Sequence, residues 1–126
     1  MAEYRVHDDP PFTLRIDTPH AALAAAHAGH GVDCSAYVTA CNPYGREVDE
    51  TDNARRHATL GRTLAARGFA CIEGAGHDPT GAWRAEPSWL VFGLDSEAAK
   101  ALGVELQQNA LLWSGADAVP RLVVLR

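Results

Sequence analysis

Strand-like and helix-like segments alternate along this chain, and this alternation restricts its fold more than any other feature. Apolar and polar residues alternate over residues 12–16, which is the period-two pattern of a half-buried strand. Residues 54–65 carry an apolar stripe at helical spacing instead, and Gly68 follows as a typical residue after a helix end. The complete pattern predicts the order β-α-β-α-β-β-α-β-β.

The boundaries of these elements follow from local signals. Thr18-Pro19 is typical of a helix start, and the alanine-rich helix after it should end near Gly29 or Gly31. Asp49 or Thr51 can cap the second helix, and Asp95 or Ser96 can cap the third. The Gly/Pro-rich segment 74–87 predicts a long loop. Strands are expected at residues 12–16, 35–41, 69–72, 89–92, 110–113 and 122–125.

One α+β domain accommodates this order. Strand–helix–strand units favour parallel neighbours, whereas directly connected strands favour antiparallel ones. We therefore expect a mixed β-sheet with about three helices packed on it. The 126 residues fit a single domain of ordinary size, which we place at residues 11–126, after a flexible N-terminus at residues 1–10.

Charge and cysteine content exclude several classes of protein. The formal net charge of −5 disfavours a nucleic-acid binder, which usually presents a basic face. The sequence shows no secretory signal and no apolar run of about 20 residues, so we expect a soluble cytoplasmic protein without a membrane segment. Cys34, Cys41 and Cys71 do not form a disulfide framework and are expected to be free thiols.

Metal and nucleophile chemistry have weak sequence support. His27, His30 and Cys34 have a spacing within metal reach, but Gly29 and Gly31 indicate a flexible helix end rather than a rigid ligand cage. We therefore predict no metal site and no cofactor. The chain contains no recognisable nucleophile or phosphate-loop motif, and Cys41 and Cys71 lie in apolar strands where burial keeps thiols inert.

Polar residues gather where a buried strand ends and the following helix begins. Thr39 and Asn42-Pro43 end the strand, while Asn53 and Arg56 lie three residues apart on the helix. Ligands of open sheets bind outside strand ends. We predict a polar pocket formed by Thr39, Asn42, Asn53, Arg56, Glu86 and Gln108.

The alternative is that these residues have only structural roles. Asn42-Pro43 would then make a turn, Asn53 would assist capping, and Arg56 would pair with Glu50 or Asp52. Glu86 would be an exposed residue at a strand edge, and Gln108 would end the third helix.

These residues also carry a resemblance to a known family. The chain resembles a small bacterial family described only as a domain of unknown function, over about Phe12 to Trp113. Members of that family typically read Thr-Ala-x-Asn-Pro, Asn-x-x-Arg, Glu-x-Ser-Phe, and a Gln before the last strands. Many also have a serine after Asn-Pro, where this chain has Tyr44-Gly45. The resemblance implies a shared fold and a shared polar site. It does not imply any known activity. The matching residues here are Thr39, Asn42, Pro43, Asn53, Glu86, Ser88 and Gln108, with Trp89 at the aromatic position.

Three functions remain open from the sequence. The first is an accessory or ligand-binding protein whose pocket holds a small polar or anionic ligand. The second is a hydrolase or transferase that uses the same pocket, with Glu86 or His57 as the base. The third is a protein-interaction module with Trp83 and Trp89 as anchors. We favour binding over catalysis.

Overall fold

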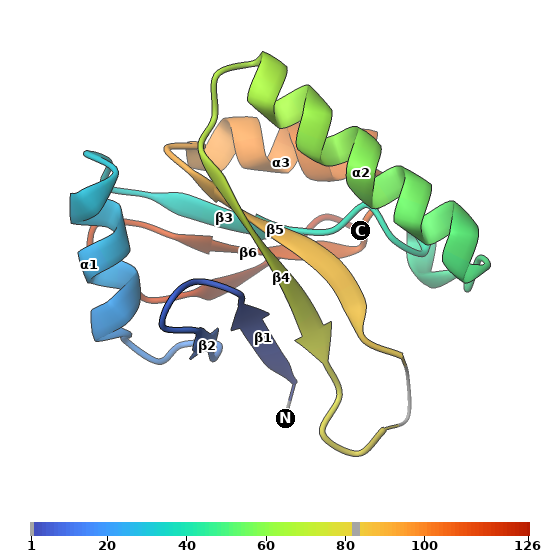
Figure 1. The fold of residues 1–126 in the computed structure, drawn as a ribbon, viewed down its shortest axis with the longest axis horizontal. Helices are drawn as coiled ribbons and strands as arrows, with labels where there is room; N and C mark the ends of the chain where they lie inside the picture. Colours follow the sequence, from blue (N-terminus) through green and yellow to red (C-terminus); the bar gives the residue numbers. More distant parts are fainter. Residues whose placement is uncertain (1, 82–83) are drawn as a thin grey trace.

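The computed structural model describes residues 2–81 and 84–126, which form a seven-stranded sheet with three α-helices packed on it (Figure 1). The expected α+β class is therefore confirmed. The elements in chain order are β1 (Glu3–Val6), β2 (Phe12–Leu14), α1 (Ala21–Gly29), β3 (Ser35–Val38), the short 3₁₀ helix η1 (Pro43–Gly45), α2 (Glu50–Ala66), β4 (Cys71–His77), β5 (Glu86–Phe92), α3 (Ser96–Glu105), β6 (Ala110–Ser114) and β7 (Arg121–Val124).

The sheet has the strand order β2-β1-β4-β5-β3-β6-β7, and each neighbouring pair of these strands is antiparallel. The expectation of a mixed sheet with parallel neighbours was wrong in this respect. The helical connections do join strands that run in the same direction, as in β3-α2-β4 and β5-α3-β6. Another strand lies between the two in each case: β5 separates β3 from β4, and β3 separates β5 from β6.

The helices divide between the two faces of the sheet. Leu60 and Leu64 of α2 and Leu102 of α3 pack with Val38 and Val91 on what we call the outer face. Leu23 of α1 packs on the inner face. The inner-face cluster also joins strands from opposite ends of the strand order, so the sheet curls toward this side, with α1 against it (Figure 1). That cluster comprises Val6, Leu14, Leu23, Tyr37, Leu90, Phe92, Leu112 and Ala118.

The N-terminal segment is part of the sheet, which corrects the expectation that residues 1–10 are flexible. Strand β1 pairs with both β2 and β4, and its Val6 side chain is completely buried. Its sequence Glu3-Tyr4-Arg5-Val6 does alternate polar and apolar residues, and the structure exposes Arg5 and buries Val6 accordingly. Four residues are a short stretch on which to predict a strand, and the segment was therefore expected to belong to a flexible N-terminus.

The segment 74–87 is a second correction, because both ends of the predicted loop are strand. Strand β4 continues to His77 and β5 begins at Glu86, with Ala75 opposite Pro87. Glycine and proline normally indicate loops. Here Gly74 provides space, since a side chain on it would overlap the backbone carbonyl of Arg5.

Helix caps agree closely with local sequence signals. The carboxylates of Asp49 and Asp95 accept hydrogen bonds from Asp52 N and Ala98 N, each at 2.8 Å. Gly68 follows α2 with a φ of +86°. The first helix differs from the expectation at Thr18-Pro19, because His20 is its N-cap, and its Nδ1 accepts from Ala22 N at 3.1 Å.

Candidate functional site

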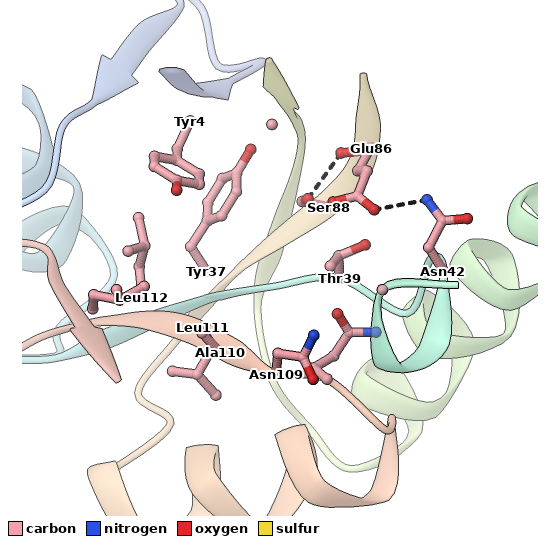
Figure 2. A pocket seen from close by; sticks show the side chains of 14 residues that line it. Tyr4, Tyr37, Thr39, Asn42, Glu86, Ser88, Asn109, Ala110, Leu111 and Leu112 are labelled. Atoms are coloured by element: carbon pink, nitrogen blue, oxygen red, sulfur yellow. Dashed lines mark hydrogen bonds between the residues drawn. The ribbon is translucent and has the colours of Figure 1, made fainter. Parts of the chain in front are cut away.

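A cavity of about 250 Å³ opens on the inner face of the sheet, and none of its lining residues comes from the three α-helices. The strands and the connections after β3 and α3 form it together (Figure 2). Its lining consists of Tyr4, Tyr37, Thr39, Asn42, Gly45, Gly76, Glu86, Ser88, Gln108, Asn109, Ala110, Leu111, Leu112 and Leu122.

Strand periodicity explains this lining. Side chains two residues apart on a strand point to the same face, so Glu86 and Ser88 share the inner face of β5. Tyr37 and Thr39 do the same along β3 and the residue that follows it. Gly76 lies on β4 between Tyr4 and Glu86 in the register of β1, β4 and β5, and its missing side chain leaves space between the two.

Asn42 is the centre of the polar network. It adopts a left-handed conformation, with φ of 48° and ψ of 63°, which asparagine tolerates better than most residues. Its Oδ1 accepts from Val48 N at 3.1 Å and from Asn53 Nδ2 at 2.9 Å. Its Nδ2 donates to Glu86 Oε2 at 2.8 Å, and Figure 2 shows the two side chains pointing toward each other. The turn after β3 is thereby tied to α2 and β5.

Asn53 completes this arrangement from the first turns of α2. Its Oδ1 accepts from the backbone N–H of Asn42 at 3.0 Å. Because a backbone N–H is always a donor, this contact fixes which end of the Asn53 amide faces Asn42. Asn53 lines a second, wider depression of about 910 Å³ beside the inner-face cavity, and it supports Asn42 rather than reaching the cavity itself.

Thr39 and Gln108 hold the other side of the turn. The Thr39 hydroxyl donates to the carbonyl of Pro87 at 2.8 Å and accepts from Cys41 N at 3.0 Å. Gln108 Nε2 donates to the carbonyl of Cys41 at 3.0 Å. These contacts join β5, the turn and the segment after α3, so the polar end of the cavity is built as one connected unit.

Within residues 2–81 and 84–126, Glu86 is the one formally charged residue on the cavity lining. Burial raises the pKa of its carboxyl group, and the hydrogen bond from Asn42 opposes this rise. Burial also raises the pKa of Tyr4, and the negative charge of Glu86 adds to that rise. A carboxylate that is partly withdrawn from water gains from a ligand that restores its lost hydrogen bonds.

Two tyrosines form the apolar end of the cavity. The rings of Tyr4 and Tyr37 meet edge to face, with centroids 5.7 Å apart. The Tyr37 hydroxyl donates to the carbonyl of Arg5 at 2.8 Å, so the ring of a β3 residue is attached to β1. This contact makes the N-terminal strand a structural part of the cavity.

The structure brings Thr39, Asn42, Glu86 and Gln108 together on the cavity, but it does not bring Arg56 there. Arg56 is exposed on α2 and lines neither the cavity nor the depression. The alternative prediction was that Arg56 pairs with Glu50 or Asp52. In the structure, Asp52 pairs with Arg55 and Glu50 pairs with Arg84.

His57, the other suggested base, lies away from the cavity. Its ring stacks on Trp89 with centroids 4.6 Å apart, and Trp89 packs on the outer-face core. The environments of the Cys41 and Cys71 thiols also disfavour the thiolate form. Burial raises the pKa of the Cys41 thiol, and burial raises the pKa of Cys71 to about 11.

The remaining sequence predictions concern metals, tryptophans and membranes. Among residues 2–81 and 84–126, no group of three or more His, Cys, Asp or Glu side chains could hold a metal ion, and His27 Nε2 instead lies 2.8 Å from Ser35 Oγ. Trp83 lies outside the described residues. The Trp89 indole donates to the carbonyl of His57 at 3.0 Å within the chain. In the same part of the chain, no helix is long and apolar enough to cross a membrane.

Tyr4, Tyr37 and Ser88 also line the cavity, although none of them was among the pocket residues predicted from the sequence. Two of them had a signal, because Tyr37 precedes Thr39 by two residues and Ser88 follows Glu86 by two. Extending each polar candidate along its strand with period two would have found them. Tyr4 lies in the alternating sequence Glu3-Tyr4-Arg5-Val6, but this segment was expected to be a flexible N-terminus.

Comparison with known proteins identifies a family. Residues 38–111 match the family model described as "Protein of unknown function (DUF3293)". The match covers more than half of the chain and includes the turn after β3, α2, β5 and Gln108, so the chain belongs to this family. No curated protein and no solved structure shows a significant match.

Proposed function

We propose that this member of the DUF3293 family is a small cytoplasmic binding protein that holds a polar small molecule in the inner-face cavity. The observation that carries the proposal is the polar end of the cavity, where the side chains are held in place by hydrogen bonds. Four polar side chains from two segments, and a fifth from a third segment, converge there, and each is fixed by hydrogen bonds to the backbone or to a neighbour. They are Thr39, Asn42, Glu86 and Ser88, with Gln108 as a fifth beside them.

The size and composition of the cavity support a small ligand. Its volume of about 250 Å³ lies below the roughly 300–1,000 Å³ typical of drug-sized sites. Apolar walls from Leu112 and the tyrosine rings with a few oriented polar groups are typical of ligand pockets. The cysteines at 34, 41 and 71 are free, which supports a reducing compartment.

Catalysis and protein interaction have less support. A hydrolase or transferase would need a nucleophile beside Glu86, and the nearby Cys41 thiol is buried and donates to the carbonyl of Pro87 at 3.5 Å. An interaction module would need exposed tryptophans, whereas the Trp89 ring packs beneath α2.

A thermal-shift screen with a panel of polar metabolites tests the proposal. A ligand present at 100 times its Kd should stabilise the wild-type protein by about 2.7 kcal/mol, which is a rise in Tm of several degrees. Ala110→Phe places a ring in the cavity and should abolish the shift, since Ala110 lines it. Ala101→Phe, on the exposed surface of α3, is the matched control and should keep the shift. Absence of any shift, or an equal shift in Ala110→Phe, would contradict the proposal.

A further inference from the structure

The hydrogen-bond donors at the polar end of the cavity are largely used within the protein. The hydroxyl groups of Thr39 and Ser88 each have one hydrogen, and these are donated to the carbonyls of Pro87 at 2.8 Å and Glu86 at 2.9 Å. The Tyr37 hydroxyl hydrogen goes to the carbonyl of Arg5. What these three groups still offer to a ligand is oxygen lone pairs.

The side-chain amide of Gln108 likewise offers only an acceptor to a ligand. Its Nε2 donates to the carbonyls of Cys41 at 3.0 Å and Leu106 at 3.3 Å, so both N–H groups are used. Because carbonyl oxygens only accept, the orientation of this amide is fixed with Oε1 as the remaining group.

Asn42 has a fixed orientation too, because its Oδ1 accepts from the backbone N–H of Val48 at 3.1 Å. Its Nδ2 must therefore face Glu86, where it donates to Oε2 at 2.8 Å. Glu86 Oε1 is the carboxylate oxygen that does not take the Asn42 hydrogen bond, and it is therefore the oxygen that can accept from a ligand.

The charge on the cavity lining also favours a ligand that donates hydrogen bonds. No arginine, lysine or histidine lines the cavity within the described residues, so the charge of Glu86 has no cationic neighbour on that lining. Withdrawing a carboxylate from water is unfavourable unless it is paired and hydrogen-bonded. Tyr4 and Tyr37 add ring surfaces, which attract cations electrostatically.

We infer that the ligand presents a cationic hydrogen-bond donor, an ammonium or guanidinium group, to Glu86 and the acceptors around it. This inference rests on the proposed function and names the class of ligand. The sequence predicted a small polar or anionic ligand, and the inference disfavours the anionic alternative because Arg56, the cation that supported it, is exposed outside the cavity. The second N–H of Asn42, the Tyr4 hydroxyl and the Asn109 amide are further donors on the lining, so the cation can carry a carbonyl or hydroxyl group beside it.

Three probes of equal size and different charge test the inference: butylammonium, butanamide and butanoate. Each is titrated into the ¹⁵N-labelled wild-type protein at pH 7, and the amide shifts of residues on the cavity lining are followed. Butylammonium should bind at least about 10 times more tightly than butanamide, which corresponds to about 1.4 kcal/mol, and butanoate should cause no saturable shift.

Glu86→Gln identifies the group responsible. Glutamine can keep an oxygen toward Asn42 Nδ2 and turns an N–H group toward the cavity, so the fold remains while the acceptor is lost. The variant should bind butylammonium at least 10 times more weakly. Glu97→Gln removes the same charge from an exposed site on α3 and should leave binding unchanged.

The outcomes separate the inference from the proposed function. Tighter binding of butanoate or butanamide than of butylammonium, or undiminished butylammonium binding by Glu86→Gln, would overturn the inference and leave a binding cavity in place. Saturable shifts from none of the three probes would overturn the cation inference, and the metabolite screen would then decide the proposed function separately.

Discussion

At the scale of single residues, Glu86 links the stability of the protein to its proposed activity. Burial raises the pKa of this carboxyl group in the folded protein above the ordinary value of 4.5. The folded state therefore binds the Glu86 proton more tightly than the unfolded state does. Stability from this group is greatest at low pH, and it is lost as the pH rises from the unfolded pKa through the raised folded pKa.

We therefore predict that Glu86→Gln is at least as stable as the wild-type protein at pH 7. The difference in free energy of unfolding between the two proteins should shrink as the pH falls toward 4, where the wild-type carboxyl group also becomes neutral. Urea unfolding of both proteins across this pH range measures the difference. A variant that is clearly less stable at pH 7 would mean that Glu86 stabilises the fold through its charge.

At the same scale, four of the six candidate site residues line one cavity, and three of these four, Thr39, Asn42 and Glu86, were predicted from their places next to strands. Thr39 and Asn42 follow a buried strand, and Glu86 begins one. Arg56 was grouped with Asn53 through helical spacing alone. Spacing shows that two side chains share a helix face, but it does not tell which of them faces the sheet.

At the scale of elements, α2 meets the sheet through a close contact at Gly61. A side chain on Gly61 would begin 2.5 Å from Trp89 Cζ2 and 3.1 Å from Cε2. Trp89 cannot easily move away, since its indole N–H donates to the carbonyl of His57 on the same helix. The helix and the strand are therefore fixed to each other on both sides of the ring.

We predict that Gly61→Ala destabilises the protein by about 1–3 kcal/mol, as overpacking does in well-packed interiors. Helix propensity alone would give the opposite sign, because alanine is favoured over glycine by about 1 kcal/mol in a helix interior. The matched control is Gly29→Ala at the end of α1, where nothing lies within 4 Å of the added carbon. Urea denaturation measures the free energy of unfolding of both variants. A Gly61→Ala variant that is more stable than the wild type would contradict the close contact between Gly61 and Trp89.

Helices were predictable from sequence because their signals are local. Asp49, Asp95 and Gly68 act within one turn of the residues that they cap. The extension of β4 and β5 through Gly74 and Pro87 was not predictable in this way, because the residues that make these two positions suitable for a strand lie far along the chain. Gly74 faces the carbonyl of Arg5, and the Pro87 carbonyl accepts from Thr39.

At the scale of the whole molecule, the sequence predicts which strands run in the same direction but not which are neighbours. The β4–β5 hairpin connection places β5 between β3 and β4, and this insertion makes the neighbouring pairs antiparallel. Pairing of β1 with β4 joins residues about 70 positions apart, such as Tyr4 with Gly76. No local pattern carries this information, and the cavity depends on it because Tyr4 lies on its lining.

The N-terminal strand gives the sharpest test of this arrangement, because β1 lies inside the sheet between β2 and β4. Removing residues 1–10 would leave β2 without its partner and would take away the buried side chain of Val6, worth about 1.5–3 kcal/mol. The Tyr37 hydroxyl would lose its acceptor, the carbonyl of Arg5, at a further cost of about 1–3 kcal/mol.

We therefore expect the variant lacking residues 1–10 to lose at least about 2.5 kcal/mol of unfolding free energy and to lose ligand-induced stabilisation with it. Urea unfolding followed by tryptophan fluorescence and far-ultraviolet circular dichroism measures the loss. Arg5→Ala keeps the backbone carbonyl that Tyr37 needs and changes only an exposed side chain, so it should stay within about 0.5 kcal/mol of the wild type. An unchanged unfolding midpoint in the truncated variant would mean that β1 adds nothing to the sheet, and a flexible N-terminus would then describe residues 1–10 correctly.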